Sequence, residues 1–130
     1  MLREISCVRQ DEPGVLRRWF QDEYFDLFVW SSSQGEIKAF QLAYDRGRSE
    51  HVLGWEQAGH YYHNRVEQGR DIPPSMMTPL LIAGGRFPKY RVLTQFDARS
   101  GALDEAVRRF VREKVVHYYF ARRPARRWRS

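Results

Sequence analysis

The chain has 130 residues, 15% of them aromatic, and one cysteine, Cys7. This length fits a single domain with its own core, the lone cysteine excludes an intramolecular disulfide, and no apolar run approaches the roughly 18 residues of a membrane span. The net charge is +6, but residues 121–130 hold five arginines and no acid, leaving 17 basic and 16 acidic side chains elsewhere. We therefore expect a nearly neutral cytoplasmic domain over residues 1–120 and a basic, disordered tail over 121–130.

The first quarter of the chain fits more than one secondary structure. Residues 3–10 alternate between apolar and polar side chains, as in a strand. Residues 13–23 contain two apolar pairs spaced four positions apart, which fits a short helix, but an extended conformation fits equally well. The sequence leaves both interpretations of residues 13–23 open.

Residues 24–66 predict a four-stranded antiparallel meander. Turn sequences separate four runs rich in β-branched or aromatic residues: YFDLFVWS, EIKAFQLAY, HVLGWEQ and HYYHNRVE. The turn at 57–59, QAG, suits a three-residue hairpin loop with Gly59 in the left-handed conformation. This loop sets Glu56 opposite His60 and Leu53 opposite His63.

The other strand pairings follow from loop length and from the apolar pattern. A four-residue loop at 32–35 sets Trp30 opposite Ile37, and Leu27 opposite Phe40. Between the two middle strands, we pair Phe40 with Trp55, because a slip of one residue would scatter the apolar side chains over both faces.

Two helices are predicted near the C-terminus. The first begins near Pro88 and ends near Arg99. The second begins after Ser100, a residue suited to the N-cap, and its apolar residues recur every three or four positions on one face. The side chains predicted to point inward are Val92, Leu93 and Phe96 in the first helix, and Ala106, Val107, Phe110, Val111, Val115, Tyr118 and Tyr119 in the second.

These elements predict an α+β fold, in which a four- to six-stranded antiparallel sheet is covered on one face by the two C-terminal helices. Alternation along the strands gives the sheet two unlike faces. The core face carries Phe25, Leu27, Val29, Phe40, Leu42, Leu53, Trp55 and Tyr61. The opposite face, which we call the second face, carries Asp26, Phe28, Trp30, Ile37, Ala39, Gln41, Ala43, Gly54, Glu56, His60 and Tyr62.

The histidines do not predict a metal site. His60 and His63 lie three positions apart, so on a strand they point to opposite faces, whereas on a helix they would share one. His51 comes near His63, but Arg65 opposite His51 disfavours a bound cation. Neither grouping reaches the three protein ligands of a usual catalytic zinc site, and no motif calls for a cofactor.

A polar cluster on the second face is one candidate site. Glu56 and His60 form a carboxylate–imidazole pair, which suits a general base or a polar ligand-binding cluster, although an ordinary cross-strand charge pair explains it more simply. The connection at 68–85, with one extended piece at 80–83, would form a lid. The candidate ligand-binding residues are Asp26, Gln41, Glu56, His60 and Tyr62; no catalytic residue is assigned.

An apolar patch on the same face is the second candidate. Phe28, Trp30 and Ile37 would expose apolar surface if left bare, and such patches mark partner-binding sites, most often in a two-fold homodimer. The predicted function is therefore a non-enzymatic interaction module that binds a second copy or another protein. The alternative is a small-ligand-binding protein or enzyme that uses the polar cluster.

The basic tail is a candidate for weak, non-specific attraction to polyanions. No nucleic-acid-binding motif accompanies it, so we expect no specific nucleic-acid recognition. The arginines concerned are Arg122, Arg123, Arg126, Arg127 and Arg129. Cys7 is expected to be a small buried apolar residue.

Overall fold

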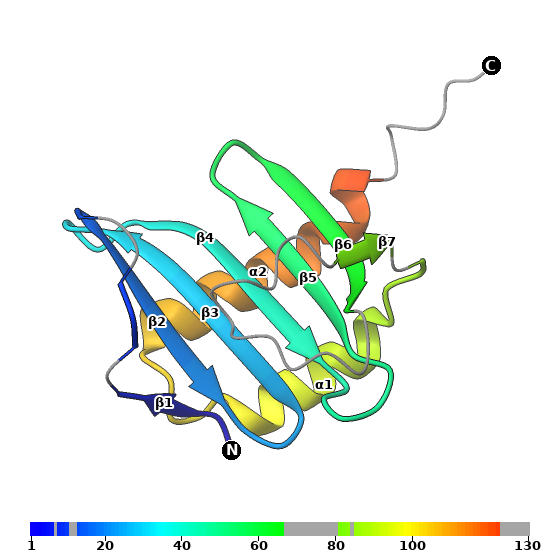
Figure 1. Ribbon diagram of the computed structural model, residues 1–130. Coiled ribbons are helices and arrows are strands. Elements are labelled where there is room, and N and C mark those ends of the chain that lie inside the picture. Colours follow the sequence, from blue (N-terminus) through cyan, green and yellow to red (C-terminus); the bar gives the residue numbers. More distant parts are fainter. Residues whose placement is uncertain (7, 11–12, 67–80, 84, 123–130) are drawn as a thin grey trace.

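The computed structural model describes residues 1–6, 8–10, 13–66, 81–83 and 85–122 (Figure 1). It contains a seven-stranded antiparallel sheet, in which every strand pairs with its neighbours in sequence, followed by two helices. The strands are β1 (Arg3–Ile5), β2 (Val15–Gln21), β3 (Phe25–Ser32), β4 (Ile37–Tyr44), β5 (His51–Glu56), β6 (His60–Val66) and β7 (Leu81–Ala83). The helices are α1 (Lys89–Arg99) and α2 (Glu105–Arg122).

The predicted fold class is confirmed: the fold is α+β, with an antiparallel meander and two C-terminal helices. The sheet has one strand more than the predicted upper limit of six. The four predicted meander strands are joined by β1 and β7, which lie within the segments 3–10 and 80–83 predicted to be extended, and by β2, which lies within residues 13–23, left open between helix and strand.

The structure resolves the ambiguity at residues 13–23 in favour of a strand. β2 pairs with β3 from Val15 to Gln21. In the extended conformation Trp19 and Phe20 point to opposite faces: Phe20 joins the core, and Trp19 stacks on Phe28 of β3. The neighbouring strand gives both aromatic rings a packing partner, which an isolated helix would lack.

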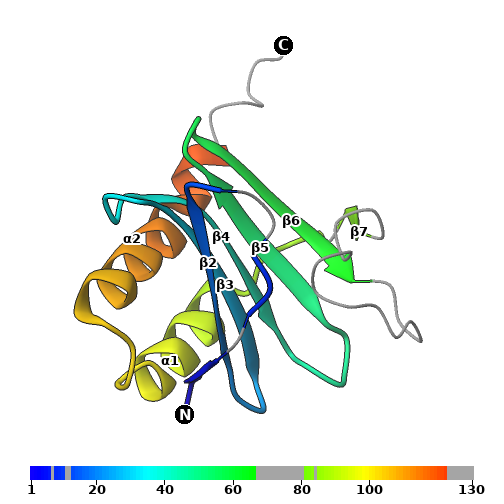
Figure 2. The same ribbon diagram turned by 60° about the vertical axis from the view of Figure 1, so that its left-hand side comes forward.

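Both helices lie against the same face of the sheet (Figure 2). The hydrophobic core lies between the two layers, and the predicted core face is confirmed. Its strand side chains are buried against Val92 and Phe96 of α1 and against Val107, Val111 and Val115 of α2. None of the helices in the described part of the chain is both long and apolar enough to cross a lipid bilayer.

The hairpin between β5 and β6 follows the prediction. Gly59 has a φ of 90°, and its amide donates to the Glu56 carbonyl at 2.8 Å. Glu56 lies opposite His60 and Leu53 opposite His63, while Phe40 of β4 lies opposite Trp55 of β5. Glycine at the one position that requires a left-handed backbone was sufficient to fix this register.

The predicted register between β3 and β4 is wrong by two residues. Leu27 lies opposite Leu42, and Trp30 lies opposite Ala39. The Ser32 amide donates to the Glu36 carbonyl, so the turn holds the three residues 33–35 instead of the predicted four, and a register shift between Trp30 and Ser31 accounts for the second residue of the error. The Ser32 hydroxyl also accepts hydrogen bonds from the amides of Gln34 and Glu36. A shift of two residues keeps the side chains from Phe25 to Trp30 and from Ala39 to Tyr44 on their predicted faces, so the predicted core residues of these two strands are unaffected.

Ile37 was predicted on the second face, and this placement is wrong. If the register that pairs Trp30 with Ala39 continued, Ile37 would lie opposite Ser32. The register instead shifts between Trp30 and Ser31, so that Ile37 lies opposite Ser31. The extra residue, Lys38, reverses the side to which the side chains at the loop end of β4 point. Ile37 therefore packs in the helix-covered core and is only 9% exposed.

Helix α1 matches its prediction, with Val92 and Phe96 buried. The predicted role of Ser100 as the N-cap of α2 is wrong: Ser100 ends α1, and α2 begins only at Glu105. The turn between them is closed by the Leu103 amide, which donates to the Ser100 carbonyl at 3.1 Å. Leu103 is thereby buried in the core, and this contact displaces the start of α2. α2 extends through Arg122, two residues into the predicted tail.

Asp22 joins the helix layer to the sheet. Its carboxylate accepts hydrogen bonds from the amides of Tyr24 and Phe25, both at 2.8 Å, and pairs with the Arg99 guanidinium at the end of α1 at 3.2 Å. Burial by itself would raise the pKa of Asp22, but these amides and Arg99 together hold the pKa below its ordinary value. This carboxylate is therefore charged in the folded protein at neutral pH.

Candidate functional site

The second face is the side of the sheet that neither helix covers (Figure 2). One row of side chains crosses it at the level of Phe28, from β2 to β6. In register along this row are Trp19, Phe28, Gln41, Gly54 and Tyr62. The row thus begins with two aromatic rings, passes a glycine and ends with a phenol.

Gly54 leaves the space that the Tyr62 side chain occupies in this row. The Tyr62 ring lies directly on the Gly54 backbone, so that a Cβ on residue 54 would come within 2.0 Å of Tyr62 Cζ. Across the glycine, Gln41 Nε2 donates to the Tyr62 hydroxyl at 2.8 Å. The hydroxyl keeps its own proton as a donor and Gln41 keeps Oε1 as an acceptor. Two half-buried side chains thus present a donor and an acceptor side by side.

Three aromatic rings, Trp19, Phe28 and Trp30, form what we call the aromatic strip. Trp19 stacks on Phe28 with ring centroids 5.4 Å apart, and Phe28 stacks on Trp30 at 6.2 Å. The Arg17 guanidinium lies 5.9 Å from the Phe28 ring centroid, in cation–π geometry. Trp19 and Trp30 are half-buried, but Phe28 is only 5% exposed.

The exposed apolar patch predicted from Phe28, Trp30 and Ile37 is therefore not present in that form. Phe28 is shielded and Ile37 belongs to the core, so of the three only Trp30 presents partly accessible apolar surface on the second face. Trp19, which the sequence could not place while residues 13–23 were ambiguous, is the second accessible ring of the strip.

Asp26 lies one row away from the aromatic strip. Its Oδ1 accepts from Trp19 Nε1 at 2.8 Å and from Gln21 Nε2 at 2.9 Å, and its Oδ2 pairs with Arg46 Nε at 3.1 Å. Burial raises the pKa of Asp26, and the hydrogen bonds and Arg46 only partly oppose this. Both carboxylate oxygens already have partners within the protein. We therefore interpret Asp26 as a residue that positions Trp19 and not as a group that contacts a bound molecule.

Glu50 is a polar residue of this region that the sequence analysis missed. It is half-buried just before β5, and burial and the negative charge of Asp26 raise its pKa, while Arg46 lowers it. Within the described residues no hydrogen bond reaches its carboxylate. No sequence signal distinguished Glu50, because it follows the turn sequence DRGRS and reads as an exposed turn residue.

Glu56 and His60 lie directly opposite each other, as predicted, but both are exposed at the end of the sheet. No hydrogen bond or ion pair between them occurs in the part of the chain that the structure describes. They lie one row beyond Gln41 and Tyr62, on the side away from Asp26. The predicted cluster of five is thus divided into Asp26, the Gln41–Tyr62 pair and the exposed Glu56 and His60.

The other histidines have structural partners. His63 points away from His60, as predicted; its Nδ1–H donates to the Gly85 carbonyl at 2.9 Å, so Nε2 accepts from the Tyr44 hydroxyl at 2.6 Å. His51 stacks on His63 with ring centroids 5.4 Å apart and lies opposite Arg65. Across residues 1–6, 8–10, 13–66, 81–83 and 85–122, no three His, Cys, Asp or Glu side chains are grouped to hold a metal.

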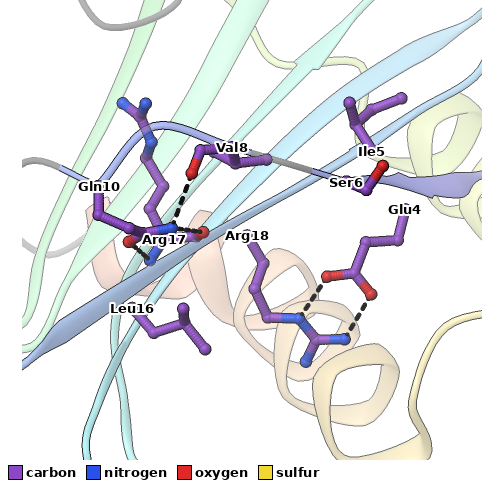
Figure 3. Close-up of a pocket in the computed structure, with 8 residues that line it drawn as sticks. All are labelled: Glu4, Ile5, Ser6, Val8, Gln10, Leu16, Arg17 and Arg18. Carbon is purple, nitrogen blue, oxygen red and sulfur yellow. Dashed lines mark hydrogen bonds and ion pairs between the residues drawn. The ribbon is translucent and has the colours of Figure 1, made fainter.

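A hollow of about 510 Å³ lies elsewhere, at the edge of the sheet beside β1 and β2 (Figure 3). None of its lining residues belongs to the predicted ligand site or interface. Its lining is Glu4, Ile5, Ser6, Val8, Gln10, Leu16, Arg17 and Arg18. It is open to solvent, and these eight described residues do not form a convergent set of polar groups, so we interpret it as a gap at the sheet edge and not as a ligand pocket.

Several predicted features lie outside the described residues. These are Cys7, most of the predicted lid at 68–85, and the tail residues Arg123, Arg126, Arg127 and Arg129. Arg122 ends α2, but its side chain is not among those described.

Comparison with known proteins adds nothing to this geometry: no family model, no curated protein and no solved structure matches the chain. The site must therefore be interpreted from its own residues.

Proposed function

We propose that this chain is a cytoplasmic, non-enzymatic interaction module, and that its second face binds either a second copy of the chain or another protein. The observation that carries the proposal is the aromatic strip, a stacked set of rings on the face without helical cover. Tryptophan and arginine are the residues most enriched among the side chains that dominate binding energy at protein interfaces.

The strip is suited to binding because its rings are already held in place. Trp19 is fixed from below by stacking on Phe28 and from its edge by the hydrogen bond to Asp26. Trp30 stacks on the other side of Phe28. Rings that are ordered before binding lose little conformational freedom when a partner arrives, which improves affinity.

The test compares Trp30→Lys with Tyr90→Lys. Tyr90 is a matched control because it is 85% exposed on α1, on the opposite side of the molecule. We expect self-association, or binding of a protein that purifies with the chain, to persist in Tyr90→Lys and to weaken about tenfold or more in Trp30→Lys. Equal binding by the two variants in sedimentation and pull-down measurements would refute the proposal.

A second candidate function is small-ligand binding beside Gln41 and Tyr62. The specific observation in its favour is the adjacent donor and acceptor that these side chains keep after bonding to each other. A planar ligand with a complementary acceptor and donor would match them, and Asp26, Glu56 and His60 lie in the neighbouring rows. This candidate differs from the first in needing the hydroxyl of Tyr62 more than the rings of the strip.

Thermal-shift screening tests this candidate. A ligand that binds the folded state raises the melting temperature by mass action. Tyr62→Phe removes only the hydroxyl, so we expect it to abolish that rise, whereas Trp30→Lys should leave it in place. If no compound in a diverse library of small amides and heterocycles shifts the melting temperature, the ligand-binding interpretation is rejected and the interaction module stands alone.

A further inference from the structure

The outer edge of β2 is only partly covered by β1. The two strands pair from Arg3 opposite Gln21 to Ile5 opposite Trp19, and there the pairing ends. Within the described residues, the segment from Val15 to Arg18 has no strand on its outer side. Such an edge carries main-chain groups that can pair with another chain.

The side chain of Gln10 occupies part of this edge (Figure 3). Gln10 Oε1 accepts from the Arg17 amide at 2.8 Å, and Gln10 Nε2 donates to the Arg17 carbonyl at 3.0 Å. These are the two bonds that a directly opposed residue of an antiparallel strand would make. Gln10 Nε2 also donates to the Val8 carbonyl at 3.1 Å, which holds the amide in place.

From this geometry we propose that Gln10 is a plug that keeps the outer edge of β2 from pairing with the β2 edge of a second copy. Main-chain groups two residues apart in a strand point to the same side, so those of Val15 point outward like those of Arg17. Between them lies Leu16, which at 50% is one of three large apolar side chains exposed in the described residues. The outward main-chain groups of Val15 and Arg17 in one copy can therefore pair with those of Arg17 and Val15 in a second copy.

The register of that pairing follows from a two-fold axis at Leu16. Val15 of each copy faces Arg17 of the other in a hydrogen-bonded pair, and the two Leu16 side chains meet in the closer, non-hydrogen-bonded pair. Arg18 adds no unpaired charge, because its guanidinium bonds both oxygens of Glu4 at 2.8 Å and one oxygen of Asp104 at 2.8 Å. Residues 8–10 lie where the second copy would enter, so the bonds of Gln10 must break first.

This inference concerns the sheet edge and goes beyond the proposed function of the second face. Its test is hydrogen exchange of the Arg17 amide, followed by NMR in the full chain. In Gln10→Ala, we expect exchange at about 20 μM to be roughly tenfold faster than in the wild type, because the acceptor for that amide is gone. At about 1 mM we expect two copies to pair and protect the Arg17 amide again. This high concentration is needed because three paired residues give only weak association.

Two further variants complete the design. Gln10→Glu keeps an acceptor for the Arg17 amide but places a carboxylate against the Arg17 carbonyl, so it should show the same behaviour more weakly and serves if Gln10→Ala folds poorly. Leu16→Lys in the Gln10→Ala background should prevent the return of protection, because two like charges would meet at the axis. Trp30→Lys should not prevent it, which separates this edge from the second face.

Two results would overturn the inference. Unchanged Arg17 protection in both Gln10 variants would show that the amide is not held by Gln10. Loss of protection that does not return at high concentration, or that returns equally with Leu16→Lys, would show that no second copy pairs at this edge.

Discussion

The two faces of this sheet are built by the same alternation of side chains but have different physical characters. On the helix-covered face, Phe40, Leu42 and Leu53 are fully buried among apolar neighbours from α1 and α2. On the second face, buried residues such as Phe28 and Val52 stand beside half-buried polar ones, including Asp26 and Gln41. A strand pattern thus assigns side chains to a face, while the element packed against that face decides how deeply they are buried.

The largest expected effect compares one phenylalanine from each face. Phe40→Ala should lower the free energy of unfolding by about 3–5 kcal/mol, because the helices cannot collapse into the cavity. Phe28→Ala should cost only about 2 kcal/mol, the transfer contribution alone, since no helix confines that side. Urea unfolding measures both. Equal losses would mean that the second face is packed as tightly as the core.

Gly54→Ala tests whether the second face depends on one close contact. The new Cβ would displace the Tyr62 ring and break its bond to Gln41, so we expect a loss of about 1–3 kcal/mol. In a Tyr62→Ala background most of this loss should disappear. Gly101→Ala is the control, because its Cβ would meet nothing closer than 3.7 Å. A loss that is unchanged in the double variant would show that the Tyr62 contact is not the cause.

Asp22 and Asp26 should give the folded protein pH dependences of opposite sign. The pKa of Asp22 is lowered, so its stabilising contribution is present above the ordinary value of 3.8 and is lost as pH falls through the lower folded pKa. The pKa of Asp26 is raised, so its contribution is greatest below 3.8 and declines as pH rises through the higher folded pKa.

Unfolding free energies of Asp22→Asn and Asp26→Asn, measured from pH 7 to pH 3, test this contrast. The wild type should exceed Asp22→Asn by about 1–3 kcal/mol near neutral pH, and this advantage should shrink towards pH 3. Relative to Asp26→Asn, the wild type should gain as the pH falls. Parallel curves for the wild type and either variant would contradict the assigned direction for that aspartate.

The smallest expected effect concerns Ser100, at the junction of the helices. Its hydroxyl is buried and forms no hydrogen bond with any of the described residues. Ser100→Ala should therefore change the free energy of unfolding by no more than about 0.5 kcal/mol, or raise it slightly. A loss above about 1 kcal/mol in thermal unfolding would reveal a role for the hydroxyl that its surroundings do not indicate.

Much of the fold could be predicted because its signals are local. Gly59 fixed one hairpin, and the period of the apolar residues fixed which side of each helix and strand is buried. The site was predicted less well. Gln41 and Tyr62 do come together, but Glu56 and His60 are exposed without bonding to each other in the described residues. Trp19 and Glu50 were missed, since one lay in an ambiguous segment and the other in a turn.

Local sequence patterns were enough to predict the antiparallel meander, the two helices and the division of side chains between two faces, because period and turn chemistry depend on residues close together in the chain. Four features became apparent only from the three-dimensional packing: the shorter turn after β3, the bulge that places Ile37 in the core, the shielding of Phe28, and the hydrogen bonds of Asp22 and Gln10. Whether a side chain is buried or hydrogen-bonded depends on neighbours that are distant in sequence, and a local sequence pattern does not identify those neighbours.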